Sequence, residues 1–308
     1  MALIARIMNR TLIIGALSGL GVALLWASWI VVTRHGVQHT LTIYDITAFR
    51  FGIAGLVILP WALRARLWRG LTPFRIAVIT VTTGVPYALL GYTGLTYAPA
   101  AHFGVFMNGL TPVFTVFVGW LWVRERIGVS RGAGVVLLLG GAALIGFETL
   151  GRAGQEGVWI GDLLMLGGAV FFALHLVTTK IWKLSLGQLL FSVCLVSGVL
   201  YLPLWLAFLP SNLAAAPWDE ILLQAVYQGL IPNLMGTSLI YVTIRSLGPN
   251  RTAVFVATVP VLAALMAIPA LDEMPCVAAW MGIAVVTVGV LLAMGAVGRQ
   301  FRFGAAAN

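Results

Sequence analysis

Long apolar runs separated by short polar or charged breaks dominate the chain. A helix that crosses the hydrocarbon core of a bilayer, about 30 Å thick, needs about 20 mostly apolar residues. Ten runs meet this requirement, near residues 11–33, 43–63, 75–97, 100–122, 130–148, 158–180, 185–209, 220–244, 250–271 and 276–297. The pattern predicts an all-α integral membrane protein with ten transmembrane helices, and no connection is long enough to hold a soluble domain.

The composition supports this prediction. The 308 residues are 61% hydrophobic and 9% charged, whereas a soluble domain has about 25% charged residues. So little charge cannot cover a surface that faces water. The net charge of +9 comes from small basic groups between apolar runs, so it indicates loops at a membrane rather than a nucleic-acid-binding surface. The run 11–33 is too long for the apolar part of a signal peptide, and we expect it to remain as the first span.

The basic residues predict the orientation of the spans, because cytoplasmic loops carry an excess of Lys and Arg. We place the N-terminus in the cytoplasm. Because ten spans are an even number, the C-terminus is then cytoplasmic too, and we expect the protein to lie in the inner (plasma) membrane. Only Arg34 and Arg152 then fall outside, and Arg50 lies within the second run. The residues on the cytoplasmic side are Arg6, Arg10, Arg64, Arg66, Arg69, Arg75, Arg124, Arg126, Arg131, Lys180, Lys183, Arg245, Arg251, Arg299 and Arg302.

The two halves of the chain resemble each other. Gly15–Arg34 and Gly161–Lys180 are offset by 146 residues and share eight identities in 20. The same offset pairs Pro86 with Pro232, and an offset of 148 pairs Pro112 with Pro260 and Glu125 with Glu273. Three matching regions in the same order indicate a duplication.

Each half holds five spans, so the second half must lie upside down relative to the first. We therefore expect two inverted five-helix repeats, residues 1–150 and 151–308, around a central cavity. Inverted repeats are typical of alternating-access transporters, whose sites lie near the midplane between the repeats.

This arrangement resembles the drug/metabolite transporter superfamily, in its EamA-type members. The resemblance rests on an early proline in a span followed by a glutamate at the next loop, as in Pro112 with Glu125 and Pro260 with Glu273, and on Trp26–Trp29 in the first span. It covers essentially the whole chain. Within the family the chain looks most like exporters of aromatic amino acids and of methyl viologen, and the resemblance implies amino-acid export, with cationic-drug efflux as the alternative. Asp272-Glu273-Met274 departs from the basic surroundings of Glu125.

Polar and aromatic residues at bilayer depth are the candidates for substrate binding, because such groups are costly in lipid and rings can stack on a substrate or hold a cation. Prolines within spans free backbone carbonyls and can act as hinges, which nominates Pro86, Pro112, Pro232 and Pro260. The candidate binding residues are Trp26, Trp29, Tyr87, Tyr92, His102, Asn108, His175, Tyr227, Asn233 and Tyr241.

Structural roles remain open for each candidate. His175 can be packed against a neighbouring carbonyl, His102 can be interfacial, and Asn108 and Asn233 can join helices. Trp and Tyr also gather at membrane interfaces, and the prolines can be static kinks. A central cavity that uses Trp29 and His175, which are equivalent in the two repeats, together with Tyr87 and Asn233 is our working hypothesis.

Acidic residues are absent from the middle third of every predicted span. Carriers driven by protons or sodium commonly use such a carboxylate, so we expect facilitated export, or coupling through His175. Arg50 either snorkels to the outer surface or pairs with Asp45. No metal or cofactor is expected, and the partners are a small-molecule substrate and the lipid bilayer, with no nucleic acid and with a monomer as one possible state.

Three other classes are disfavoured. A membrane enzyme requires a clustered nucleophile and base or metal ligands, whereas the four histidines are scattered. A channel usually shows a repeated pore loop or a ring of like residues. A receptor without transport has no positive signal in the sequence, and a flux assay separates it from a carrier.

Overall fold

The computed structural model describes residues 2–124, 128–150 and 157–294, and the regular structure in these ranges is entirely helical. Eight helical segments are long and apolar enough to cross a membrane. Val277–Ala293, with 17 residues, is a shorter apolar helix. The predicted span near 220–244 corresponds to the helical segment Trp218–Leu247, which carries polar residues such as Gln228 and Asn233 and is not among these eight. The predicted all-α membrane fold is thus confirmed, and the count of ten spans stays a prediction.

The first half contains five such segments. The third is broken at Gly84, and the fourth changes between α-helix and the wider π-helix. Its elements are α1 (Ala2–Gln38), α2 (Ile43–Ala65), α3 (Pro73–Thr83), α4 (Val85–Tyr97), α5 (Ala100–His102), η1 (Phe103–Gly109), α6 (Thr111–Val118), η2 (Gly119–Val123) and α7 (Val129–Leu150).

The second half repeats the plan with breaks of its own. Its second and third segments each contain a π-helical stretch. Its elements are α8 (Val158–Trp182), α9 (Leu186–Leu190), η3 (Phe191–Val196), α10 (Ser197–Phe208), α11 (Trp218–Leu230), η4 (Ile231–Gly236), α12 (Thr237–Leu247), α13 (Pro249–Leu271) and α14 (Val277–Ala293).

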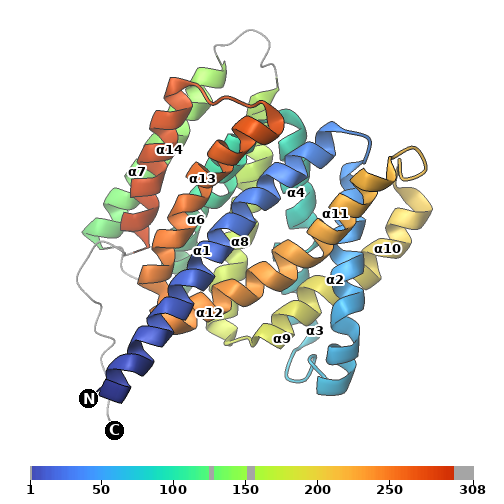
Figure 1. The fold of residues 1–308 in the computed structure, drawn as a ribbon, viewed down its shortest axis with the longest axis horizontal. Coiled ribbons are helices and arrows are strands. Elements are labelled where there is room, and N and C mark those ends of the chain that lie inside the picture. Colours follow the sequence, from blue (N-terminus) through green and yellow to red (C-terminus); the bar gives the residue numbers. More distant parts are fainter. Residues whose placement is uncertain (1, 125–127, 151–156, 295–308) are drawn as a thin grey trace.

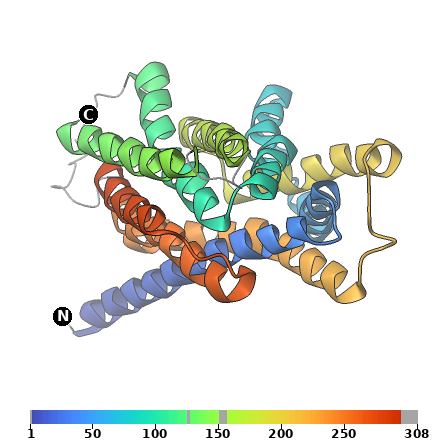
Figure 2. The ribbon, with the colours of Figure 1, turned by 90° about the horizontal axis from the view of Figure 1, so that it is seen from above.

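The contacts between helices repeat with the two halves exchanged. α1 packs against α13 and α12, and its counterpart α8 packs against α6 and α4. The fifth segments, α7 and α14, pack against each other, as do the second segments, α2 and η3–α10. Figures 1 and 2 show α7 and α14 side by side at one edge, with α10 at the other. This exchange is what an inverted duplication requires. The boundary at residue 150 stays a prediction, because 151–156 lie outside the described residues.

Glycines let α7 and α14 approach closely. A Cβ atom at Gly134 would lie 2.4 Å from the backbone nitrogen of Ala293, and one at Gly282 would lie 2.7 Å from the carbonyl oxygen of Gly141. Small residues commonly make such backbone contacts between helices in lipid, where no hydrophobic force drives helices together. This edge pair therefore ties the two halves together away from the centre.

Three of the four predicted hinge prolines lie at interruptions of a helix. Pro86 follows the break at Gly84, Pro112 is the second residue of α6 just after η1, and Pro232 lies within η4. Pro260 differs, because it lies inside α13, which continues unbroken from Pro249 to Leu271. Hinge motion stays a prediction for all four, and Pro260 is not a point of helix breakage.

The connections lie on two sides of the molecule. Those between α1 and α2, α10 and α11, and α13 and α14 lie towards the top of Figure 1, whereas those between α2 and α3 and between α8 and α9 lie towards the bottom. The bottom connections carry Arg66, Arg69 and Lys183. The protein is therefore a multi-span membrane protein whose basic side is predicted to be cytoplasmic. Several residues of that prediction lie outside the described part, namely Arg126, Arg152, Arg299 and Arg302.

Candidate substrate cavity

A cavity of about 300 Å³ lies between the two halves. The first half contributes residues of α1, α2, α3, α4 and η1, and the second half contributes α8, α9, η3, η4 and α12. Three of these elements, η1, η3 and η4, are π-helical. Such stretches often mark functional sites because they displace side chains from the regular helical register.

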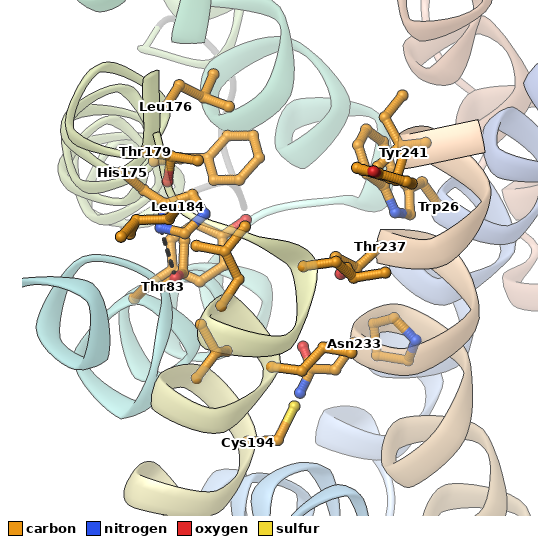
Figure 3. A pocket seen from close by; sticks show the side chains of 18 of the residues that line it. Trp26, Thr83, His175, Leu176, Thr179, Leu184, Cys194, Asn233, Thr237 and Tyr241 are labelled. Carbon is orange, nitrogen blue, oxygen red and sulfur yellow. Dashed lines mark hydrogen bonds between the residues drawn. The ribbon is translucent and has the colours of Figure 1, made fainter. Parts of the chain in front are cut away.

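Seven of the ten predicted binding residues line this cavity: Trp26, Trp29, Tyr87, Asn108, His175, Asn233 and Tyr241. They include the four residues of the working hypothesis. Those four form two repeat-related pairs, because the offset of 146 residues joins Trp29 to His175 and Tyr87 to Asn233. Figure 3 shows His175 and Thr179 on one side of the cavity and Trp26 and Tyr241 on the other. Substrate contact by these residues stays a prediction.

The other three predicted residues lie away from the cavity lining. The ring of Tyr92 is fully buried, and its hydroxyl donates to Oε1 of Gln228 at 3.0 Å. The hydroxyl of Tyr227 donates to Oγ of Ser28 at 2.5 Å. His102 is buried, not interfacial, and its Nδ1 lies 2.8 Å from Oδ1 of Asp162. Each side chain is engaged in contacts between helices, which explains its place at bilayer depth without a substrate.

Aromatic rings form one wall of the cavity. Tyr87 contacts Phe172, with ring centroids 5.7 Å apart, and Phe172 stacks on His175 with an interplanar angle of 8°. Nδ1 of His175 lies 3.0 Å from Oγ1 of Thr83, which is the contact drawn in Figure 3. His175 thus has a fixed ring orientation, and its recorded side-chain partner is Thr83 and not the backbone carbonyl of the structural alternative.

Arg50 is the lining residue that sequence reasoning failed to place. It is 5% exposed, so it does not snorkel to the surface. It does not pair with Asp45 either, since the Asp45 carboxylate accepts from the backbone of Thr42 and Asn212 and from Nε1 of Trp205. Its guanidinium carbon instead lies 4.8 Å from the centroid of the Trp29 ring. Its position seven residues into the second run was the available signal.

Buried hydrogen bonds hold Arg50 and Trp29 in place. Nη1 of Arg50 donates to the Tyr92 hydroxyl at 3.2 Å. Oε1 of Gln228 accepts from that hydroxyl and from Nε1 of Trp29, the latter at 2.9 Å. Nε2 of Gln228 donates to Thr33. Because each group has a partner on a different helix, the network fixes the rings and the guanidinium that face the cavity.

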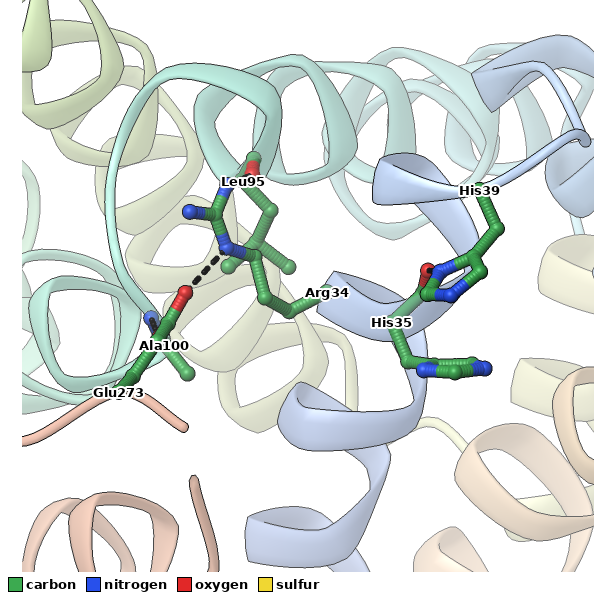
Figure 4. A network of polar contacts seen from close by, with 6 residues as sticks. All are labelled: Arg34, His35, His39, Leu95, Ala100 and Glu273. Carbon is green, nitrogen blue, oxygen red and sulfur yellow. Dashed lines mark hydrogen bonds and ion pairs between the residues drawn. The ribbon is translucent and has the colours of Figure 1, made fainter. Parts of the chain in front are cut away.

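Polar contacts join the two halves at the end that is predicted to be extracellular. Nε of Arg34 lies 2.7 Å from Oε1 of Glu273, and Oε2 of Glu273 accepts from the backbone N–H of Ala100 at 2.8 Å. Arg34 also donates to the carbonyl of Leu95 (Figure 4). Two residues beyond Ala100, His102 meets Asp162 of α8. Both contacts join the first half to the second.

The cavity extends in the opposite direction. Leu184 and Leu186 from the connection between α8 and α9 line it, together with Ile244 near the end of α12. Lys183 and Arg245 lie beside these residues in the chain. The cavity thus reaches the end that the basic residues predict to be cytoplasmic.

The sequences of both halves match one family. Residues 13–147 and 159–295 each match the EamA-like transporter family. The chain belongs to this family. The family model describes transporters, and two curated relatives are named as transporters.

Individual proteins similar to this chain match it over shorter regions or at lower identity. An uncharacterized transporter of Archaeoglobus fulgidus is 30% identical over 155 residues, which cover 49% of this chain and 44% of the relative. The uncharacterized transporter YvbV of Bacillus subtilis is 36% identical over 114 residues, 34% of this chain and 36% of the relative. The chain thus matches less than half the length of each curated relative. One protein of known crystal structure is 22% identical, with a TM-score of 0.63 over 91% of this chain and 96% of its own, which shows the shared fold.

Proposed function

We propose that this EamA-like protein is an alternating-access exporter of amino acids with aromatic side chains, working by facilitated diffusion. The observation that carries the proposal is the aromatic-walled cavity between the two halves, which extends towards one end of the molecule while polar contacts join the halves at the other end. Such a cavity suits a substrate with a flat ring, because rings stack favourably on Trp, Tyr and Phe.

In this mechanism the substrate enters from the side of Lys183, the predicted cytoplasmic side. It meets Trp29, Tyr87, His175 and Asn233, which line the cavity from both halves. The halves then rock, the contacts of Glu273 and Asp162 with the first half break, and the cavity opens outward. Among the described lining residues there is no Asp or Glu, which favours facilitation over coupling to a proton at the binding site.

Efflux of cationic drugs such as methyl viologen is the second candidate, since a flat dication can also stack on rings. The charge of the cavity disfavours it. Arg50 is the one Lys or Arg among the described lining residues, and a dication would approach it without a carboxylate to offset the repulsion. A net-neutral amino acid meets no such penalty.

Counterflow in liposomes tests the proposal. Purified protein is reconstituted, and exchange of radiolabelled phenylalanine, tryptophan and threonine is followed with and without a pH gradient. We expect saturable exchange of the two aromatic amino acids that is indifferent to the gradient. Methyl viologen exchange without amino-acid exchange, by a preparation of unchanged fold, would show that the second candidate is right.

Variants locate the site. Single alanine substitutions at Trp29, Tyr87, His175 and Asn233 are expected to raise KM by about tenfold each, the effect of one lost contact of about 1.4 kcal/mol. The control is Trp68→Ala, because Trp68 is exposed and lies outside the cavity. Unchanged exchange by all four variants would mean that the substrate passes elsewhere.

A further inference from the structure

Arg50 carries a buried charge that the protein leaves without a counter-ion. A guanidinium has five N–H donors, and the structure records one hydrogen bond for them, from Nη1 to Tyr92. Nε is buried with no partner. The ion pairs found among the described residues join Arg34 to Glu273 and His102 to Asp162, and neither involves Arg50. A buried charge of this kind is expensive unless a ligand completes its coordination.

A second unpaired donor belongs to a residue that lines the same cavity from the other half. Nδ2 of Asn233 on η4 is buried and has no partner. Asn233 is 5% exposed, as Arg50 is, and both residues belong to the cavity lining. Two buried polar side chains that lack acceptors, one in each half, favour a ligand that brings oxygen acceptors with it.

The chemistry of the surroundings defines that ligand. Carboxylates accept two parallel hydrogen bonds from a guanidinium, and such charge-assisted bonds are the strong ones. The Tyr92 hydroxyl donates its proton to Gln228, so its oxygen lone pairs are left for Arg50 and hold the guanidinium in place. The ring of Trp29 lies against this charge, and the rings of Tyr87 and Phe172 line the same cavity. The cavity therefore combines a site for one anionic group with apolar ring surfaces.

The same lining offers no fixed anion for an ammonium group, since it contains no Asp or Glu among the described residues. We infer that Arg50, assisted by Asn233, binds the carboxylate of the substrate, and that the substrate class is aromatic monocarboxylates in which the ammonium group is dispensable. This inference names the substrate class of the cavity and so rests on the proposed function. Aromatic amino acids are members of this class, as are aromatic acids that lack the amino group.

Three small ligands separate the contributions of the two charged groups. Phenylalanine carries both, 3-phenylpropionate keeps only the carboxylate, and phenethylamine keeps only the ammonium group. Their binding is measured by calorimetry on the purified full-length protein in detergent. We expect 3-phenylpropionate to bind within about threefold of phenylalanine and phenethylamine to bind at least tenfold more weakly, since one lost charge-assisted contact exceeds 1.4 kcal/mol.

Variants of Arg50 connect this preference to the residue. Arg50→Gln should weaken the binding of both carboxylates by about 30-fold or more and leave phenethylamine unchanged or stronger. Arg50→Lys should bind the carboxylates with an affinity between those of wild type and Arg50→Gln, because lysine keeps the charge without the planar guanidinium. The control is Arg64→Gln, an exposed arginine near the end of the same helix. Helical circular dichroism and size-exclusion profiles identify any variant that fails to fold, and Arg50→Lys then supplies the comparison.

Three results would overturn the inference: phenethylamine binding as tightly as 3-phenylpropionate, Arg50→Gln retaining full affinity for the carboxylates, or wild-type protein binding none of the three ligands. Counterflow distinguishes these failures from failure of the proposed function. The expected binding pattern without any exchange would leave the carboxylate site standing and remove the exporter. Exchange of phenylalanine by Arg50→Gln at the wild-type rate and KM would leave the exporter standing and remove the carboxylate site.

Discussion

The surroundings of Arg34 and Arg50 differ although both side chains are largely buried in helices of the first half. Arg34 has a carboxylate at 2.7 Å, the carbonyl of Leu95 and, with the Gln38 amide turned to satisfy both groups, an oxygen 2.9 Å from Nη2. Arg50 has one hydroxyl and the faces of Trp29 and Phe51. Arg34 therefore joins the two halves, whereas most N–H donors of Arg50 remain for a ligand in the cavity.

This difference shows how one residue type serves two purposes in a membrane protein. A buried arginine with all its partners supplied by the chain stabilises one conformation. One without a counter-ion lowers the stability of the empty protein and is retained for what it binds. Stability measurements can thus separate the two roles without knowledge of the substrate.

The largest expected effect follows the loss of the counter-ion of Arg34. Glu273→Ala leaves that charge buried and unpaired, and the free energy of unfolding should fall by about 3 kcal/mol. Equilibrium unfolding in SDS measures it. Glu273→Gln keeps an acceptor for Arg34 and is the matched control, with a smaller loss. Equal stability of Glu273→Ala and wild type would mean that the pair does not hold the halves together.

Arg50→Gln should act in the opposite direction. Removal of an uncompensated buried charge is expected to raise the free energy of unfolding of the ligand-free protein by about 1 kcal/mol, because the desolvation cost of the charge disappears. The same unfolding assay measures this change, and Arg64→Gln should leave it unaltered. A loss as large as that of Glu273→Ala would show that Arg50 is structural.

Tyr92→Phe tests the link between Arg50 and the buried network. The hydroxyl accepts from Arg50 and donates to Gln228, so its removal should cost about 1 kcal/mol of stability. Carboxylate affinity should change by no more than about threefold, an effect under 0.7 kcal/mol, since the guanidinium keeps its charge. A 30-fold loss in calorimetry would instead assign the recognition to Tyr92.

The smallest effects are expected at the repeat-related threonines. Oγ1 of Thr33 accepts from Gln228 at 2.9 Å, whereas Oγ1 of Thr179 has no partner and Thr179 lines the cavity. Thr33→Val should lower the free energy of unfolding by about 1 kcal/mol, because it leaves a buried N–H of Gln228 without this acceptor. Thr179→Val should leave the free energy of unfolding almost unchanged, because no buried donor loses a partner. Melting temperatures of the two purified variants measure the contrast. Equal shifts would show that the halves are energetically alike at this position.

Much of the fold followed from the sequence because lipid imposes local rules. Every backbone group in the hydrocarbon must be bonded within its own helix, so apolar runs of sufficient length predicted the ten segments. Glu125, which the repeat pairs with Glu273, lies outside the described residues and leaves that part of the motif as a prediction. The offset of 146 residues also placed Trp29 and His175 in equivalent positions, and both line the cavity.

The hydrogen-bond partners of the buried polar side chains could not be predicted from the sequence in the same way. His102 was expected at the interface or in the site, but it meets Asp162, 60 residues further along the chain. Tyr92 and Tyr227 were predicted to bind substrate because they are aromatic residues at bilayer depth, yet their hydroxyls form hydrogen bonds between helices. Sequence patterns give the depth of such residues in the bilayer and not the side of the helix that faces a neighbour.

By itself the sequence determined the all-helical membrane fold, the internal repeat and the resemblance to the family, since each depends on short-range periodicity or on likeness between segments. The tertiary structure alone decided that Arg34 meets Glu273, 239 residues away, and that Arg50 meets no carboxylate. The physical reason is that the cost of a buried charge depends on which helix faces pack together, and that packing is set by contacts between residues far apart in the chain.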